Sequence, residues 1–173
     1  MSQACPYCGA DVIEGADVCD ECQHSLTDMS LPEPTSEVER GLLRDLVTEL
    51  SPHKPLTVPP TATIGETLAK MVAESIGCIV VADGGKMVGI FTERDALLRV
   101  NVDAVKLADR PISSVMTPNP ATLRAEDKIA LALQRMNVGG YRHLPILDGE
   151  ELVGVISIRD ILNYLTEHNA AAG

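Results

Sequence analysis

Residues 89–95 read GIFTERD, and residues 154–160 read GVISIRD. Both stretches contain a glycine, a hydroxyl residue three positions later and then an Arg-Asp pair, and they start 65 residues apart. The same offset aligns residues 50–100 with residues 115–165 without a gap. An internal match of this length means that one structural unit occurs twice in the chain.

Each copy predicts the element order β-α-β-β-α. Apolar residues three and four apart indicate helices, and an Asp-Gly pair at 83–84 and again at 148–149 indicates the turn of a β-hairpin. In the first copy the expected elements cover residues 56–58, 63–75, 78–82, 86–91 and 93–99. In the second copy they cover residues 121–123, 126–138, 143–147, 151–156 and 158–167. The predicted fold class is therefore α/β (α+β), built from two such repeats.

Four motifs carry a family resemblance. The two closing segments resemble the nucleotide motif of CBS domains, while VMTPNPAT (115–122) and YRHLPI (141–146) resemble two further stretches that this family places around its ligand. The chain resembles a tandem CBS pair, the Bateman module, over about residues 50–167. The resemblance implies a pseudo-twofold module with two clefts that bind AMP, ADP, ATP or S-adenosylmethionine. It also implies that two modules often pair into a flat disk.

The chemistry of the second motif suits an adenine nucleotide. Ser157 is expected at a helix N-cap, where unpaired N–H groups favour a phosphate. The Asp160 carboxylate can accept both hydrogens of a ribose diol. The predicted site is completed by the basic residues Arg142, His143 and Arg159, and by Leu144 and Thr122, whose neighbouring backbone groups are expected to contact the adenine edge.

The first copy has a poorer set of ligand-binding groups. Its predicted nucleotide-binding residues are Thr57, Thr92, Arg94 and Asp95. The positions that match Arg142 and His143 are Gly77 and Cys78, so the first copy lacks two partners for phosphate. We therefore expect the second cleft to bind more strongly. Cys78 lies in an apolar stretch and is predicted to be a buried core residue.

Both motifs also have a purely structural interpretation. Thr-x-x-Asp and Ser-x-x-Asp resemble capping boxes, which need only stabilise the start of a helix. The duplication at matching positions and the neighbouring motifs favour nucleotide binding over this alternative.

Four cysteines near the N-terminus form a second pattern. Cys5, Cys8, Cys19 and Cys22 have the spacing C-x2-C-x10-C-x2-C, which is typical of a tetrahedral site for structural zinc. The segment resembles the short zinc ribbons of many prokaryotic regulatory proteins. Its first half, CPYCG, also resembles half of a rubredoxin site, so iron is an alternative. His24 follows closely but is not needed as a ligand.

The chain divides into five predicted parts. They are a zinc ribbon (1–26), a proline-containing linker (27–35), an amphipathic helix that begins with a Ser-x-x-Glu capping box (36–50), the first CBS repeat with a connecting segment (51–110), and the second repeat with a short tail (111–173).

The composition argues against several functions. The net charge is −11, and residues 1–36 contain seven acidic residues but no Lys or Arg, so nothing supplies the electrostatic term of nucleic-acid binding. Only four aromatic residues are available for base stacking. No stretch is long enough to span a membrane or to act as a signal peptide, and the cysteine pattern favours a reducing compartment, which predicts a cytoplasmic protein.

We expect a regulatory protein rather than an enzyme, because no nucleophile with an adjacent base and no open metal site can be assigned. An adenine nucleotide would bind between the repeats, the protein would form a homodimer through paired CBS modules, and an unidentified protein partner would receive the signal. The alternative is an adaptor that dimerises through its repeats, docks its partner through the zinc ribbon and does not respond to nucleotide.

Overall fold

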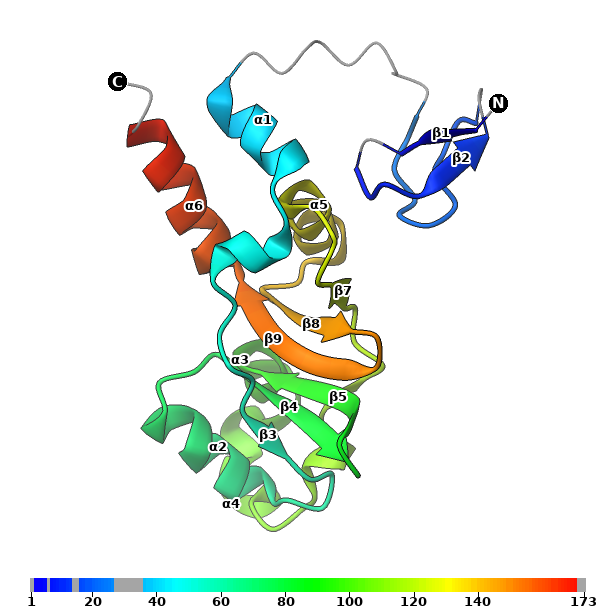
Figure 1. Ribbon diagram of the computed structural model, residues 1–173. Helices are drawn as coiled ribbons and strands as arrows, with labels where there is room; N and C mark the ends of the chain where they lie inside the picture. Colours follow the sequence, from blue (N-terminus) through cyan, green and yellow to red (C-terminus); the bar gives the residue numbers. More distant parts are fainter. Residues whose placement is uncertain (1, 6, 14–15, 27–35, 171–173) are drawn as a thin grey trace. The chain divides into compact units, whose positions relative to one another are not determined.

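The computed structural model describes residues 2–5, 7–13, 16–26 and 36–170 of the 173-residue chain (Figure 1). The predicted linker at 27–35 lies outside these ranges. The predicted zinc ribbon contains an antiparallel pair of strands, β1 (Ser2–Ala4) and β2 (Asp11–Ile13). No helix in the described ranges is long and apolar enough to cross a membrane.

The first repeat forms a sheet with the strand order β3-β4-β5-β6. Strand β3 (Thr57–Val58) runs parallel to β4 (Cys78–Asp83), and β4 forms an antiparallel hairpin with β5 (Lys86–Thr92). The hairpin turn contains two glycines with positive φ, as the Asp-Gly signal predicts. The last strand, β6 (Thr117–Pro118), pairs antiparallel with β5, although its residues open the second copy of the sequence repeat.

Helix α2 (Ile64–Ala73) lies within the predicted range 63–75 and begins with a capping box. The helix predicted over 93–99 is wrong in type, because only α3 (Glu93–Asp95) is α-helical and a π-helical segment (Ala96–Val100) continues it. A wider turn changes the direction in which the following side chains project, and Val100 is buried here. A 3-10 turn (Asn101–Asp103) and α4 (Ala104–Leu107) complete the segment.

A cluster of apolar side chains forms the core of this repeat. Its buried members come from β3, α2, both strands of the hairpin and the segment after α3, and they are Val58, Ile64, Met71, Ile79, Val81, Phe91, Val100, Ile112 and Val115. Burial of these side chains supplies the main stabilisation of the repeat.

The second repeat has a sheet with the order β7-β8-β9. Its elements are β7 (Leu123–Arg124), α5 (Ile129–Gly139), β8 (His143–Asp148), β9 (Glu151–Ser157) and α6 (Ile158–Ala170). Strands β4 and β8 show the same order of buried and exposed positions. Met136 on α5 is buried, as is its counterpart Met71 on α2. The predicted duplication is therefore confirmed in three dimensions.

The continuous helix predicted over 36–50 is wrong. Helix α1 (Glu37–Arg44) starts at the expected Ser36 capping box but ends at Asp45, and a 3-10 turn (Val47–Leu50) follows. The Asp45 backbone is extended and its carbonyl accepts a hydrogen bond from the Ile129 N–H (3.1 Å), while the Val47 N–H donates to the Asp127 carbonyl (2.8 Å). Hydrogen bonds to the second repeat thus replace those of a continued helix.

A side-chain hydrogen bond also connects the end of α1 to α6. The Tyr164 hydroxyl on α6 donates to Asp45 Oδ2 (2.7 Å), and Arg44 Nε lies 2.8 Å from Asp45 Oδ1. The hydrogen bonds from Arg44 and Tyr164 lower the pKa of the Asp45 carboxyl, and burial raises the pKa of Tyr164. A methyl group placed on Gly41 of α1 would overlap the Tyr164 hydroxyl, so glycine permits this close approach.

We expect Gly41→Ala to destabilise the chain by about 1–3 kcal/mol, because the added methyl collides with a hydroxyl that Asp45 holds in place. In a Tyr164→Phe background, the same change is expected to become neutral or stabilising by up to about 1 kcal/mol, since alanine favours helices and the obstacle is gone. Urea unfolding of the four proteins in this double-mutant cycle measures the difference. An equal effect in both backgrounds would contradict the contact.

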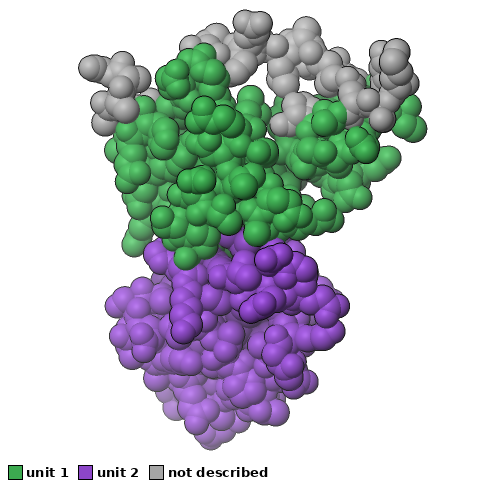
Figure 2. Space-filling model, in the orientation of Figure 1, with its two compact units in different colours: residues 1–52, 123–144, 156–173 green, residues 53–122, 145–155 purple. Residues whose placement is uncertain are grey.

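The chain forms two compact units, shown in separate colours in Figure 2. One contains residues 1–52, 123–144 and 156–173, and the other contains residues 53–122 and 145–155. The division passes through β8 and β9, so it does not coincide with the boundary between the sequence repeats.

Candidate functional site

The first motif is a capping box at the end of β5. Thr92 is the N-cap of α3, its hydroxyl accepts a hydrogen bond from the Asp95 N–H, and Asp95 Oδ2 accepts from the Thr92 N–H (3.0 Å) and from the Thr92 hydroxyl (2.7 Å). The structural interpretation of Thr-x-x-Asp is therefore realised here. The Asp95 carboxylate is also buried, with only 8% of the residue exposed.

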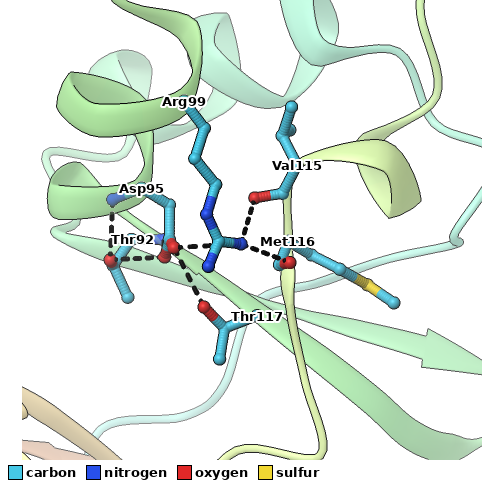
Figure 3. Close-up of polar contacts among 6 residues, drawn as sticks. All are labelled: Thr92, Asp95, Arg99, Val115, Met116 and Thr117. Carbon is cyan, nitrogen blue, oxygen red and sulfur yellow. Dashed lines mark hydrogen bonds and ion pairs between the residues drawn. The ribbon is translucent and has the colours of Figure 1, made fainter.

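Two residues that the sequence analysis did not select complete this cluster (Figure 3). The Thr117 hydroxyl donates to Asp95 Oδ1 (2.9 Å), and Arg99 Nη1 forms an ion pair with the same oxygen (3.4 Å). Arg99 Nη1 also donates to the carbonyls of Val115 (2.9 Å) and Met116 (2.6 Å). Arg99 stands four residues after Asp95, which is the spacing of a helical ion pair and could have identified it.

The second motif repeats the two hydrogen bonds to the aspartate carboxylate. Asp160 Oδ2 accepts from the Ser157 N–H (2.7 Å) and from the Ser157 hydroxyl (2.8 Å), and Asp160 is as deeply buried as Asp95. The positions that match Thr117 and Arg99 are Pro52 and Tyr164. Proline has no donor, and the Tyr164 hydroxyl donates to Asp45 instead. The two motifs therefore share their caps but differ in their surroundings.

The prediction that the first helical N–H groups of the second motif are unpaired is wrong for Ile158, and the matching N–H of Glu93 in the first motif is paired as well. The Glu93 N–H donates to the Gly77 carbonyl (3.0 Å), and at the matching position the Ile158 N–H donates to the Arg142 carbonyl (2.9 Å). Gly77, the residue before β4, therefore lies beside the first motif, and Arg142, the residue before β8, lies beside the second. In the second repeat this contact brings Arg142, and next to it His143, to the start of α6.

The other predicted nucleotide-binding residues are spread over the two sheets. Arg94 and Arg159 are exposed in the first turns after the caps, Leu144 is fully buried in β8, Thr57 lies on the outer strand β3, and Thr122 is half-buried just before β7. The structure brings together the capping pairs, Thr92 with Asp95 and Ser157 with Asp160, and it places Arg142 beside the second pair.

Cys78 is half-buried rather than part of the core, which corrects the prediction for this residue. It occupies the end of β4 opposite Thr92, where the sheet stops and side chains are less covered. Burial and the nearby Glu93 carboxylate raise the pKa of the Cys78 thiol to about 12, so the group is neutral at physiological pH.

The four predicted metal ligands converge. The sulfur atoms of Cys5, Cys8, Cys19 and Cys22 all lie within 4.8 Å of one another, and the Cys5–Cys22 and Cys8–Cys19 pairs are each 3.7 Å apart. Tetrahedral zinc with sulfur ligands requires sulfur atoms about 3.8 Å apart, which follows from a Zn–S distance of about 2.3 Å. The donor set therefore fits a tetrahedral metal ion.

The two cysteine turns are built alike. The Gly9 N–H donates to the Cys5 carbonyl and the Gln23 N–H donates to the Cys19 carbonyl, both at 2.8 Å. Gly9 in the first turn and Gln23 in the second both have positive φ. Glycine adopts this conformation readily, and in the second turn a glutamine adopts it. His24 is absent from the metal-ligand cluster, and its ring contacts the Tyr7 ring at a tilt of 31°.

The thiols need a cation to remain ionised together. Burial raises the pKa of Cys8 to about 11 and also raises the pKa of Cys22, so both would be protonated at neutral pH without metal. The pKa of Cys19 is lowered despite burial, because backbone hydrogen bonds from Cys22 and Glu21 stabilise its thiolate. Such N–H donors also support sulfur atoms that bind a metal.

Comparison with known proteins identifies the repeats. Residues 44–101 and 112–167 match the family described as the CBS domain. The CBS domain-containing protein CBSCBSPB1 of Arabidopsis thaliana is 34% identical over 117 residues, which cover 67% of this chain and 22% of that protein. The chain spans about a fifth to a quarter of the length of the Arabidopsis relatives that it matches.

Solved structures match the same part of the chain. The CBS-domain containing protein ATU1752 from Agrobacterium tumefaciens has a TM-score of 0.64 and 31% identity, and the match covers 68% of this chain and 97% of that one. The CBS domain protein PAE2072 from Pyrobaculum aerophilum, solved in complex with AMP, has a TM-score of 0.62 and 28% identity, with 72% and 98% covered.

Proposed function

The chain belongs to the CBS-domain family, and from this premise we propose that it is a regulatory protein whose second motif binds an adenine nucleotide. CBS-domain proteins are generally regulatory rather than catalytic. The nucleotide stabilises one arrangement of the chain through its higher affinity for that arrangement, and a protein partner responds to the change.

One observation carries this proposal: the backbone carbonyl of Arg142, the residue before His143, accepts a hydrogen bond from the Ile158 N–H at the start of α6, the helix whose first turn contains the buried Asp160. A carboxylate suits a ribose diol and the basic groups suit phosphates. The complex of PAE2072 with AMP supports an adenine nucleotide as the ligand class. The first motif lacks the basic pair, since Gly77 and Cys78 stand there.

We place the protein in the cytoplasm as a homodimer. None of the five cysteines forms a disulfide, which suits a reducing compartment. The segment after α3 exposes four large apolar side chains, and a second copy of the chain would cover them; they are Leu97, Leu98, Val102 and Val105.

The cysteine cluster is proposed to hold structural zinc. Four sulfur ligands leave no open position for catalysis, so the metal would only stabilise the ribbon. Elemental analysis of the purified protein should give about one zinc per chain. A coloured protein that contains iron would overturn the choice of metal.

Calorimetric titration of the zinc-loaded chain with AMP, ADP, ATP and S-adenosylmethionine tests the nucleotide proposal. We expect saturable binding of at least one of them. The control ligand is adenine alone, which lacks both the ribose and the phosphates that the basic and acidic side chains recognise. No heat of binding with any of the four ligands at millimolar concentration would contradict the proposal.

The adaptor function is favoured by a different observation. The ribbon exposes the apolar side chains Ile13 and Val18 among acidic residues, which suits a docking surface for a protein. If the chain is only an adaptor, its partner binds with the same affinity whether or not nucleotide is present. A nucleotide-dependent affinity favours the sensor.

A further inference from the structure

We propose that the first motif is closed to nucleotides by its own chain, because Thr117 and Arg99 occupy the carboxylate oxygen of Asp95 that a ribose would need. This inference rests on the proposed function and assigns Arg99 and Thr117 as residues that determine how many nucleotides the chain binds.

Three hydrogen bonds and one ion pair from the same chain already engage the Asp95 carboxylate. A carboxylate offers about four acceptor positions. Oδ2 receives two hydrogen bonds from Thr92, while Oδ1 receives one from the Thr117 hydroxyl and faces the Arg99 guanidinium (Figure 3). A ribose diol that binds Oδ1 would have to displace the hydroxyl and compete with the internal cation.

Two further hydrogen bonds hold the Arg99 guanidinium in place. Its Nη1 donates to the carbonyls of Val115 and Met116, the two residues that precede Thr117. The same short segment therefore fixes the arginine and supplies the competing hydroxyl. Strand β6 begins at Thr117 and pairs with β5, which holds the segment against the strand that carries the motif.

The second motif has different residues at the two positions that match Thr117 and Arg99. Pro52 stands at the position of Thr117, and Tyr164 at the position of Arg99 directs its hydroxyl to Asp45. The duplicated motifs have thus diverged at positions outside the motif itself. This divergence acts in addition to the missing phosphate partners at Gly77 and Cys78.

Equilibrium dialysis of the full zinc-loaded chain with radiolabelled AMP, up to millimolar concentration, tests the closure. Wild type should bind about one AMP per chain, and the double variant Arg99→Met, Thr117→Val should bind about two. Losing a competing charged hydrogen bond corresponds to at least about a tenfold gain in affinity at the opened motif. Thr117→Val alone keeps the Arg99 contacts to Val115 and Met116 and should show part of the gain.

Lys106→Met is the matched control, since it removes one exposed positive charge from the same region without touching the cluster. It should keep about one AMP per chain. Two AMP per wild-type chain, or one AMP in a folded double variant, would overturn the closure while leaving the proposed function standing. No AMP on wild type but one on the double variant would support the closure and contradict the second motif as the site. No AMP on either protein would contradict both proposals.

Discussion

Removal of the metal is expected to unfold residues 5–26 while both CBS repeats remain folded. The ribbon has a very small apolar core beyond its ligands, in which Val12 and Leu26 are buried. A segment of this size rarely buries enough surface to fold alone. Metal binding therefore supplies most of its folding free energy, on the order of 10 kcal/mol or more for structural zinc. A chelator should collapse the ribbon amide signals of a 1H–15N correlation spectrum to random-coil positions.

The fifth cysteine offers a matched control for this experiment. Cys19→Ser should lose the zinc and reproduce the effect of the chelator, whereas Cys78→Ser lies outside the cluster and should retain one zinc per chain. The repeat signals should stay in place in both variants. Dispersed ribbon signals in the metal-free protein would show that the metal is not needed for folding.

Asp160→Ala is expected to weaken AMP binding by at least about tenfold, and Asp95→Ala is expected to change it little. A hydrogen bond to a charged group contributes about 1.5–3 kcal/mol, and 1.4 kcal/mol corresponds to a factor of ten. Asp95, in contrast, holds Thr92 and Thr117 within its own chain, so its loss should lower stability rather than affinity. Calorimetric titration and thermal unfolding of both variants separate the two effects.

Asp160 also bonds to Ser157 at the start of α6. A loss of affinity in Asp160→Ala could therefore result from a loss of structure alone. Asp127→Ala controls for this explanation. Asp127 is an equally buried carboxylate of the same repeat that accepts a hydrogen bond from the Arg124 N–H (2.8 Å), and it belongs to neither motif. The Asp127→Ala variant should be less stable than the wild type but keep its affinity for AMP. Equal losses of affinity in Asp95→Ala and Asp160→Ala would refute the ranking of the motifs.

Local patterns were enough to predict most of the fold. The hairpins, the helices after β3 and β7 and the cysteine turns all depend on residues close together in sequence, where periodicity and turn chemistry apply. The early end of α1 at Asp45 was not predictable in this way. It depends on hydrogen bonds to Asp127 and Ile129, which come from the second repeat.

In the candidate sites, too, only contacts between residues close together in sequence could be predicted. The capping pairs could be identified because three residues separate their members, and the cysteine cluster because two short turns converge on one metal. Thr117 was missed as a partner of Asp95, since a contact between residues that lie 22 positions apart leaves no local signal in one sequence. Arg99 had such a signal in its spacing from Asp95, but its bonds to Val115 and Met116 became visible only in three dimensions.

The pairing of β6 with β5 has a consequence for the ancestry of the chain. Each copy lends its opening residues to the hairpin of the other: Thr117 and Pro118 border β5, and His53 pairs with Val155 of β9. A solitary ancestral unit would have left this hairpin edge open, and an open strand edge invites another strand. Two identical single-repeat polypeptides that exchanged these segments would cover both hairpin edges in the same way, and the duplicated chain makes this exchange within one molecule.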